Sequence, residues 1–116
     1  MTEQMKNSVV TWKDRNAIVR PAGDVVAAQV PELRSTLRDA LARGVQEMTI
    51  DFSEVEMVDS TGLGLLISAH NSISKAGGRL AVIHASQEIL ELFRSMRIHQ
   101  HFPVSQRGGT ASGVEQ

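Results

Sequence analysis

The polar side chains that could take part in chemistry gather in one stretch of the chain, Val58-Asp59-Ser60-Thr61-Gly62-Leu63-Gly64. This stretch follows a strand-like run at 48–52, in which apolar and polar residues alternate, and it leads into a helix-like run from about residue 61 to residue 76. Ser60 therefore falls at the N-terminus of a predicted helix, where the first backbone N–H groups have no partner within the helix. A serine hydroxyl at this position can cap the helix, and a phosphate on that hydroxyl would be stabilised by the helix dipole by about 0.3–1 kcal/mol. The position alone predicts either a plain helix cap or a phosphate acceptor.

The neighbours of Ser60 also allow a structural and a functional interpretation. Asp59 is either a carboxylate favoured by the dipole near a helix start or a contact for a protein partner. Thr61 is either a helix-start residue or a second hydroxyl that could accept a phosphate. Gly62 and Gly64 each cost a helix about 1 kcal/mol relative to alanine, which indicates close packing or a surface kept clear for a partner. Asp24, in an earlier loop, is typical of a solvated turn.

Other catalytic and metal-binding chemistry finds little support in the sequence. The chain contains no cysteine, which excludes disulfides, thiol catalysis and thiolate metal sites. His99 and His101 would lie on one side of a strand, but no third metal ligand is evident. Ser60 lacks the Gly-x-Ser-x-Gly context of a hydrolase nucleophile, since Val58 stands two residues before it, and no phosphate-binding Gly-x-x-x-x-Gly-Lys-Ser/Thr loop is present. We therefore expect no enzymatic activity, no metal and no cofactor.

Length, charge and hydropathy indicate a single small domain. The chain has 116 residues, of which 41% are hydrophobic, and this is enough for one core. Twelve basic and thirteen acidic residues produce no broad field that would attract nucleic acid or anionic lipid. No signal pattern or apolar run of eighteen residues is present. We expect a cytoplasmic protein that makes no direct contact with nucleic acid, does not insert into a membrane, and is a monomer or a weak dimer.

The elements that must position Ser60 follow from periodicity. Two short β-prone runs come first, and the amphipathic pattern after Pro31 predicts a helix that ends at Arg43 and Gly44. The central strand and the helix after Ser60 come next, followed by an apolar strand at 80–83, a helix capped by Ser86, and a short edge strand within 98–104. This order predicts an α/β fold, bordering on α+β, with a mixed sheet of four to five strands and helices packed largely on one face. We expect a flexible N-terminal lead at 1–7, one domain at 8–104 and a disordered tail at 105–116.

The sequence around Ser60 resembles that of a known family. Asp51-Phe52-Ser53-Glu54-Val55, followed by Val58-Asp59-Ser60-Thr61-Gly62-Leu63-Gly64, is similar to the signature of the STAS domain, the family of bacterial anti-sigma-factor antagonists. The order of elements from Val9 to Phe102 is similar as well. The resemblance implies a non-enzymatic switch in transcription regulation, which binds a protein serine kinase that doubles as an anti-sigma factor. The kinase phosphorylates the serine that matches Ser60 and so releases the antagonist, and a phosphoserine phosphatase restores it.

On this resemblance we expect Ser60 to be the phosphorylation site and the surrounding residues to bind the partner, namely Asp24, Val58, Asp59, Ser60, Thr61, Gly62 and Gly64. One position departs from the family pattern. Many members carry Gly-acidic-aliphatic-Asp in the loop after the second strand, whereas this chain has Gly23-Asp24-Val25-Val26. If the missing carboxylate helps the kinase or its metal to address the serine, phosphorylation of Ser60 would be slow or would need an unusual partner.

Two functions of other classes use the same residues. One is a constitutive scaffold or subunit, such as the STAS-type component of a membrane transport complex, which would use the same helix without modification. The other is a nucleotide- or anion-binding module that uses the helix N-terminus as its anion site.

Overall fold

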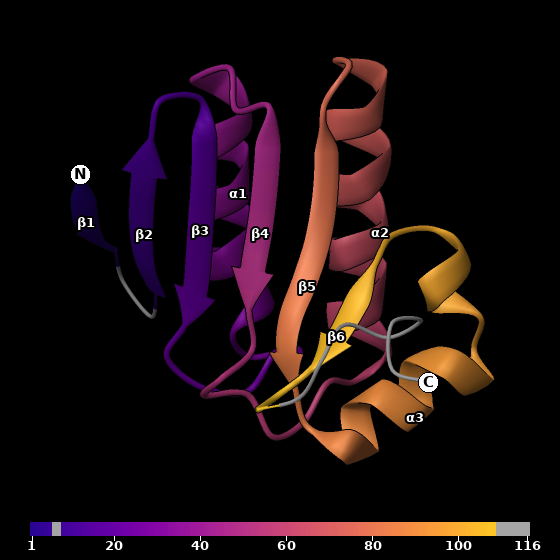
Figure 1. Cartoon of the computed structure of the whole chain (residues 1–116). Coiled ribbons are helices and arrows are strands. Elements are labelled where there is room, and N and C mark those ends of the chain that lie inside the picture. The colour runs from indigo at the N-terminus through magenta and orange to yellow at the C-terminus, as the bar shows by residue number, and fades with distance from the viewer. Residues whose placement is uncertain (6–7, 109–116) are drawn as a thin grey trace.

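The computed structural model describes residues 1–5 and 8–108, which form one mixed sheet with helices packed mainly on one side (Figure 1). Along the chain the elements are β1 (Thr2–Met5), β2 (Ser8–Lys13), β3 (Asn16–Pro21), α1 (Val30–Ala42), β4 (Glu47–Asp51), α2 (Ser60–Lys75), β5 (Arg79–Ala85), α3 (Gln87–Ser95), the short 3-10 helix η1 (Ile98–Gln100) and β6 (Val104–Gln106). The α/β class and the mixed sheet predicted from the sequence are confirmed.

The order of strands in the sheet is the same as their order in the chain. The first three strands pair antiparallel, and β3, β4, β5 and β6 pair parallel. Each parallel pair needs a crossover, and α1, α2 and α3 supply the three crossovers. Right-handed crossovers that all step in one direction place their helices on the same face. Figure 1 accordingly shows α1 and α2 side by side behind the sheet, with α3 near the β6 edge.

The core lies between the sheet and these helices. Met48 and Ile50 of β4 are buried, whereas Thr49 between them is half-buried on the other face, as the alternating pattern predicts. Phe52 and Phe93 meet edge to face, with ring centroids 6.2 Å apart, and so fix α3 against the end of β4. The helices contribute the buried side chains Leu33, Leu37, Leu63, Leu66, Ile73, Ile89 and Leu90.

Several boundaries differ from those expected. The described residues contain six strands rather than four to five, because Thr2–Met5, expected in a flexible lead, form β1. This strand pairs with β2, and the terminal ammonium of Met1 donates to the carbonyl of Trp12 at 2.8 Å. An edge strand of this kind is held by main-chain bonds and has no apolar alternation that the sequence would reveal.

The C-terminal expectations also need correction. The segment at 98–104 begins with η1, and the last strand starts only at Val104. His99 therefore lies in a 3-10 turn and His101 just after it, so the two do not share one side of a strand. β6 continues to Gln106, beyond the expected end of the domain, and the rest of the expected tail from residue 109 lies outside the described residues. No helix within the described chain is long and apolar enough to span a membrane.

Candidate functional site

The junction between β4 and α2 places Ser60 at the first helical position. Asp59, in extended conformation, is the N-cap, and its Oδ1 accepts the N–H of Gly62 at 2.9 Å. The capping role that the sequence allowed for Ser60 thus belongs to Asp59. Aspartate and serine are similarly favoured caps, and a helix start read from sequence is uncertain by one or two residues. The Ser60 side chain is consequently exposed and forms no hydrogen bond with the described part of the chain.

Asp59 also ties the helix to a second loop. Its Oδ2 accepts the N–H of Ala27 at 2.9 Å, so one carboxylate links the start of α2 to the segment between β3 and α1. These two donors, first Gly62 and then Ala27, hold the pKa of the Asp59 carboxyl below its ordinary value. The N-terminus of α2 therefore already carries a carboxylate at the position that a bound anion would take.

The two loops meet along a short parallel bridge between Val25 and Val58. The N–H of Val25 donates to the carbonyl of Met57 at 3.0 Å, and the N–H of Asp59 donates to the carbonyl of Val25 at 3.3 Å. The Val25 side chain is fully buried, and that of Val58 is only 7% exposed. Val58, which the resemblance placed among the partner-binding residues, contributes its side chain to the interior of the junction.

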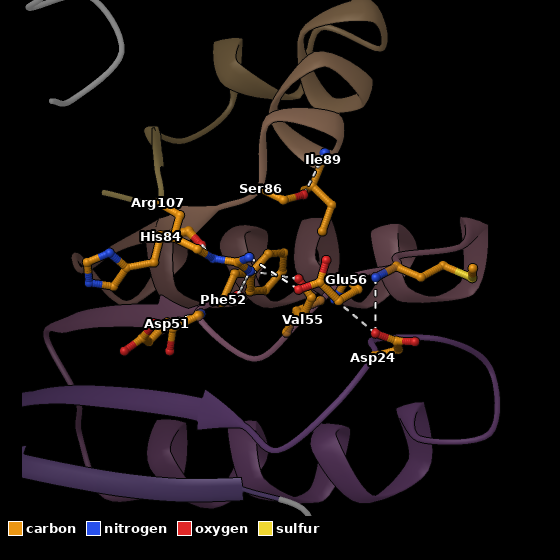
Figure 2. Close-up of polar contacts among 11 residues, drawn as sticks. Asp24, Asp51, Phe52, Val55, Glu56, His84, Ser86, Ile89 and Arg107 are labelled. Carbon is orange, nitrogen blue, oxygen red and sulfur yellow. Dashed lines mark hydrogen bonds and ion pairs between the residues drawn. The ribbon is translucent and has the colours of Figure 1, made fainter. Parts of the chain in front are cut away.

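Asp24 shapes the loop that leads to Ser60. Its Oδ1 accepts the N–H groups of Glu56 and Met57, at 2.9 and 3.1 Å (Figure 2). This carboxylate fixes the backbone immediately before Val58 and thereby the direction in which the chain enters α2. Asp24 is a half-buried structural acceptor and not simply the solvated turn residue that its type suggests.

The two glycines of the first turns have different surroundings. A β-carbon at Gly62 would stand 2.1 Å from the carbonyl oxygen of Val25 and 2.8 Å from its Cγ1, which is closer than real side chains approach. At Gly64 a β-carbon would meet nothing within 4 Å. Gly62 therefore allows α2 to pack on the loop at Val25, and Gly64 leaves the outer face of the helix bare.

Four exposed residues lie in the loop just before α2 and in its first turns. We use the name junction surface for Met57, Ser60, Thr61 and Gly64, all of which are exposed. Met57 is the apolar member, and its side chain is 59% exposed. An exposed methionine beside hydroxyl groups and a bare glycine is a surface that a protein partner could cover.

Val26 stands at the position where the family pattern has an aspartate. It is half-buried, and its carbonyl accepts the N–H groups of Gln29 and Val30 at 2.8 and 3.1 Å at the start of α1. A cavity of about 290 Å³ beside it is lined by Pro21, Ala22, Gly23, Asp24, Val26, Gln29 and Leu33. Asp24 is the one ionisable group in this lining, so the cavity does not favour an anion.

Arg107, which was expected to lie in a disordered tail, contacts the loop that leads to Ser60. Its guanidinium donates to the carbonyls of Phe52 and Val55 at 2.8 and 3.0 Å, and its Nη1 lies 3.2 Å from a carboxylate oxygen of Glu56 (Figure 2). The sequence carries no local signal for these contacts, because Arg107 and Phe52 are 55 residues apart. Within the described chain, no group of three histidine or acidic side chains is placed to hold a metal ion.

Comparison with known proteins gives a consistent set of relatives. The family model described as Mlab, STAS domain matches residues 8–104. The anti-sigma-B factor antagonist of Staphylococcus aureus is 28% identical over 87 residues, which cover 75% of this chain and 81% of that protein.

Solved structures show the same fold at lower identity. A crystal structure described as a candidate anti-sigma factor antagonist from Thermotoga maritima has a TM-score of 0.77 at 20% identity, and the match covers 82% of each chain. The anti-sigma factor antagonist SpoIIAA in its unphosphorylated form has a TM-score of 0.64 at 20% identity, with 75% of this chain and 81% of that chain covered. SpoIIAA from Bacillus in its phosphorylated form has a TM-score of 0.63 at 16% identity, with 91% and 90% covered.

Proposed function

This chain belongs to the STAS domain family of anti-sigma factor antagonists, and we propose that it acts by partner switching through Ser60. In this proposal the unmodified protein binds a serine kinase that doubles as an anti-sigma factor. Phosphorylation of Ser60 by that kinase releases the antagonist, and a phosphoserine phosphatase restores it. The observation that carries the proposal is the Ser60 side chain, which is exposed at the head of α2 and has no capping role because Asp59 caps the helix.

The surroundings of Ser60 support a docking surface. Met57 offers an exposed apolar side chain, and Gly64 lets a partner approach the backbone of α2 closely. Thr61 is exposed beside Ser60 and Asp59 is half-buried, so both can contribute polar contacts at the rim. The conformation of the loop and of the first turn of α2 is held by three residues that contribute less to the exposed surface, namely Asp24, Val58 and Gly62.

A phosphate on Ser60 would oppose docking by electrostatics. It adds about −1.5 to −2 charges next to Asp59, whose carboxylate is held in its charged form by two backbone donors. A partner that covers this surface would have to desolvate the phosphate or place an acidic group against it. If the phosphate makes the binding free energy less favourable by about 2.8 kcal/mol, the affinity for the partner falls about a hundredfold.

The test compares two substitutions at one position. Purified wild-type protein is incubated with the candidate serine kinases of the same genome, and intact mass is measured; we expect a phosphate mass shift that Ser60→Ala abolishes and Thr61→Ala retains. Affinity for the kinase that binds is then measured for Ser60→Ala and Ser60→Asp. We expect Ser60→Asp to bind at least tenfold more weakly than Ser60→Ala. Equal affinity of the two variants would contradict the switch.

A constitutive subunit is the second candidate, and Val26 is the observation that favours it. The family pattern implied by the resemblance has a carboxylate at this position, whereas this chain presents an aliphatic side chain and a carbonyl that is already used by the first turn of α1. A subunit of a membrane transport complex could use the same junction surface without modification. Recovery of a transporter ATPase from cells, with no phosphate on Ser60, would support this alternative. A nucleotide-binding role is disfavoured because Asp59 occupies the N-terminus of α2.

A further inference from the structure

Arg107 joins the end of the sheet to the loop that carries the junction surface. It follows β6 directly, and its backbone N–H donates to the carbonyl of Ala85 at 2.7 Å, so its position is set by the pairing of β6 with β5. The side chain then turns toward the β4–α2 loop, as Figure 2 shows. The guanidinium Nε donates to the carbonyl of His84 at 3.2 Å, and Nη2 donates to the carbonyls of Phe52 and Val55 at 2.8 and 3.0 Å.

The contacts of Arg107 and Asp24 with this loop are complementary. Arg107 donates to two carbonyls of the loop, and Asp24 accepts two of its N–H groups, those of Glu56 and Met57. The Phe52 carbonyl also accepts the N–H of Val55 at 2.9 Å, so Arg107 is its second donor. Asp24 and Arg107 together pair the N–H groups of Glu56 and Met57 and the carbonyl of Val55 outside any helix or strand ladder. The segment 52–57 can therefore keep one shape without regular secondary structure. A lysine would replace Arg107 only in part, because a single ammonium does not reproduce the planar fork of five donors.

We propose that Arg107 is a positioning residue for partner docking, acting through the β4–α2 loop to hold Met57 and Ser60 in their binding geometry. This inference rests on the proposed function, since it takes the junction surface to be the docking surface. Arg107 does not need to touch the partner. The ion pair with Glu56 is a secondary part of the arrangement, because the Glu56 side chain is 66% exposed and exposed ion pairs contribute little.

The chain offers two matched controls for a test of Arg107. Arg43 is an arginine of similar involvement away from the junction surface: it pairs with Glu3 at 2.9 Å and lies over the ring of Trp12 at 4.5 Å. Arg43→Ala therefore removes an arginine with several contacts while leaving the β4–α2 loop untouched. Glu56→Gln removes the ion pair of Arg107 while leaving its bonds to the carbonyls in place.

The first measurement needs no partner. Amide hydrogen exchange is recorded for Arg107→Ala, Arg107→Lys, Arg43→Ala and Glu56→Gln, at a temperature where circular dichroism shows every variant folded. We expect the amides of Glu56 and Met57 to exchange at least tenfold faster in Arg107→Ala, and less so in Arg107→Lys. We expect Arg43→Ala and Glu56→Gln to leave these amides within about twofold of the wild type. Unchanged exchange at Glu56 and Met57 in Arg107→Ala would overturn the proposal.

The second measurement is the affinity of the same variants for the kinase that phosphorylates or binds the wild type. We expect Arg107→Ala to weaken binding about tenfold, mainly through faster dissociation, with partial recovery in Arg107→Lys and none of this effect in Arg43→Ala. Wild-type affinity in Arg107→Ala, or an equal loss in Arg43→Ala, would overturn the positioning role. Failure of the phosphorylation switch would be detected separately, as equal affinity of Ser60→Ala and Ser60→Asp for the kinase. The affinities of the Arg107 variants could still be compared with that of the wild type in this case.

Discussion

Adding one methyl group at Gly62 and at Gly64 should change stability in opposite directions, although the two glycines are only two residues apart. At Gly62 the new β-carbon would lie 2.1 Å from the carbonyl oxygen of Val25. An ordinary contact begins near 3.4 Å, so α2 and the loop would have to separate by about 1 Å. The contacted atom is backbone, and the same carbonyl accepts the N–H of Asp59 at 3.3 Å, so a side-chain rotation cannot relieve the clash.

The magnitudes follow from two opposing effects. Overpacking costs about 1–3 kcal/mol, and the rigid contact at Gly62 places it near the upper end of that range. Replacing glycine by alanine within a helix returns about 1 kcal/mol. We therefore expect Gly62→Ala to lower the free energy of unfolding by about 2 kcal/mol. At Gly64 only the helical gain remains, so Gly64→Ala should raise the free energy of unfolding by up to about 1 kcal/mol.

Urea unfolding followed by circular dichroism measures both variants against the wild type. With a slope of about 1.5 kcal/mol/M, a difference of about 3 kcal/mol between the two variants separates their midpoints by about 2 M. If Gly62→Ala is as stable as the wild type, the first turn of α2 does not pack on Val25 as described. If Gly64→Ala is destabilised, its position is not open. Partner affinity gives an independent result, since the stabilised Gly64→Ala variant should bind more weakly when its methyl group stands on the junction surface.

Two further substitutions test the carboxylates of the junction. The pKa of Asp59 is lowered in the folded chain, so its charge stabilises the fold above the unfolded pKa of about 3.9, and that contribution is lost as the pH falls through the lower folded value. Asp59→Asn keeps an oxygen acceptor for the cap but removes the charge. The urea midpoint of the wild type should therefore exceed that of the variant at pH 7 and approach it toward pH 2. A difference between the two midpoints that stays constant with pH would contradict the role of the charge. Asp24→Ala should cost about 1–2 kcal/mol in urea unfolding and weaken partner binding, because the N–H groups of Glu56 and Met57 lose their acceptor. Asp24→Asn, which keeps the Oδ1 acceptor, is the control and should lie close to the wild type.

The parallel part of the sheet was predictable because burial leaves a periodic signal. Met48 and Ile50 alternate with polar residues on β4, and the apolar run that begins at Leu80 forms β5. A continuous apolar run is typical of a strand covered on both faces, but of this run only Leu80 and Val82 are buried, and Ala81 and Ile83 are half-buried. The edge strand β1 has no such signal, since it is held by main-chain bonds to β2 and its described side chains are largely exposed. The late start of β6 was missed because η1 carries the buried Ile98, which alternation cannot distinguish from a strand residue.

The strand-to-helix junction at the candidate site was predictable from the sequence, but the contacts that hold it were not. The strand-to-helix junction follows from local sequence, because a helix start is a local event, but the sequence left open whether Ser60 or another residue caps the helix. The contacts that hold the junction are long-range: Asp24 and Glu56 are 32 residues apart, and Arg107 and Phe52 are 55 apart. Nothing in the residues adjacent to Asp24 or Arg107 indicates which backbone groups they meet. The sequence also left open whether Gly62 or Gly64 is needed for packing. The two glycines differ because the Val25 carbonyl lies against Gly62, whereas nothing lies within 4 Å of a β-carbon at Gly64.

The capping by Asp59 bears directly on how a phosphate on Ser60 would act. Both carboxylate oxygens of Asp59 are used, one by Gly62 and one by Ala27, so the N-cap hydrogen bond of α2 is made before any modification. A phosphate on Ser60 would not be needed to organise the helix, and it would meet a carboxylate close by. Its charge would therefore remain on the outside of the junction, where it acts on a partner and not on the packing of Val25 and Val58 beneath. A switch built in this way requires no refolding of the domain, because the same rigid junction presents either a neutral hydroxyl or a dianion to whatever binds there.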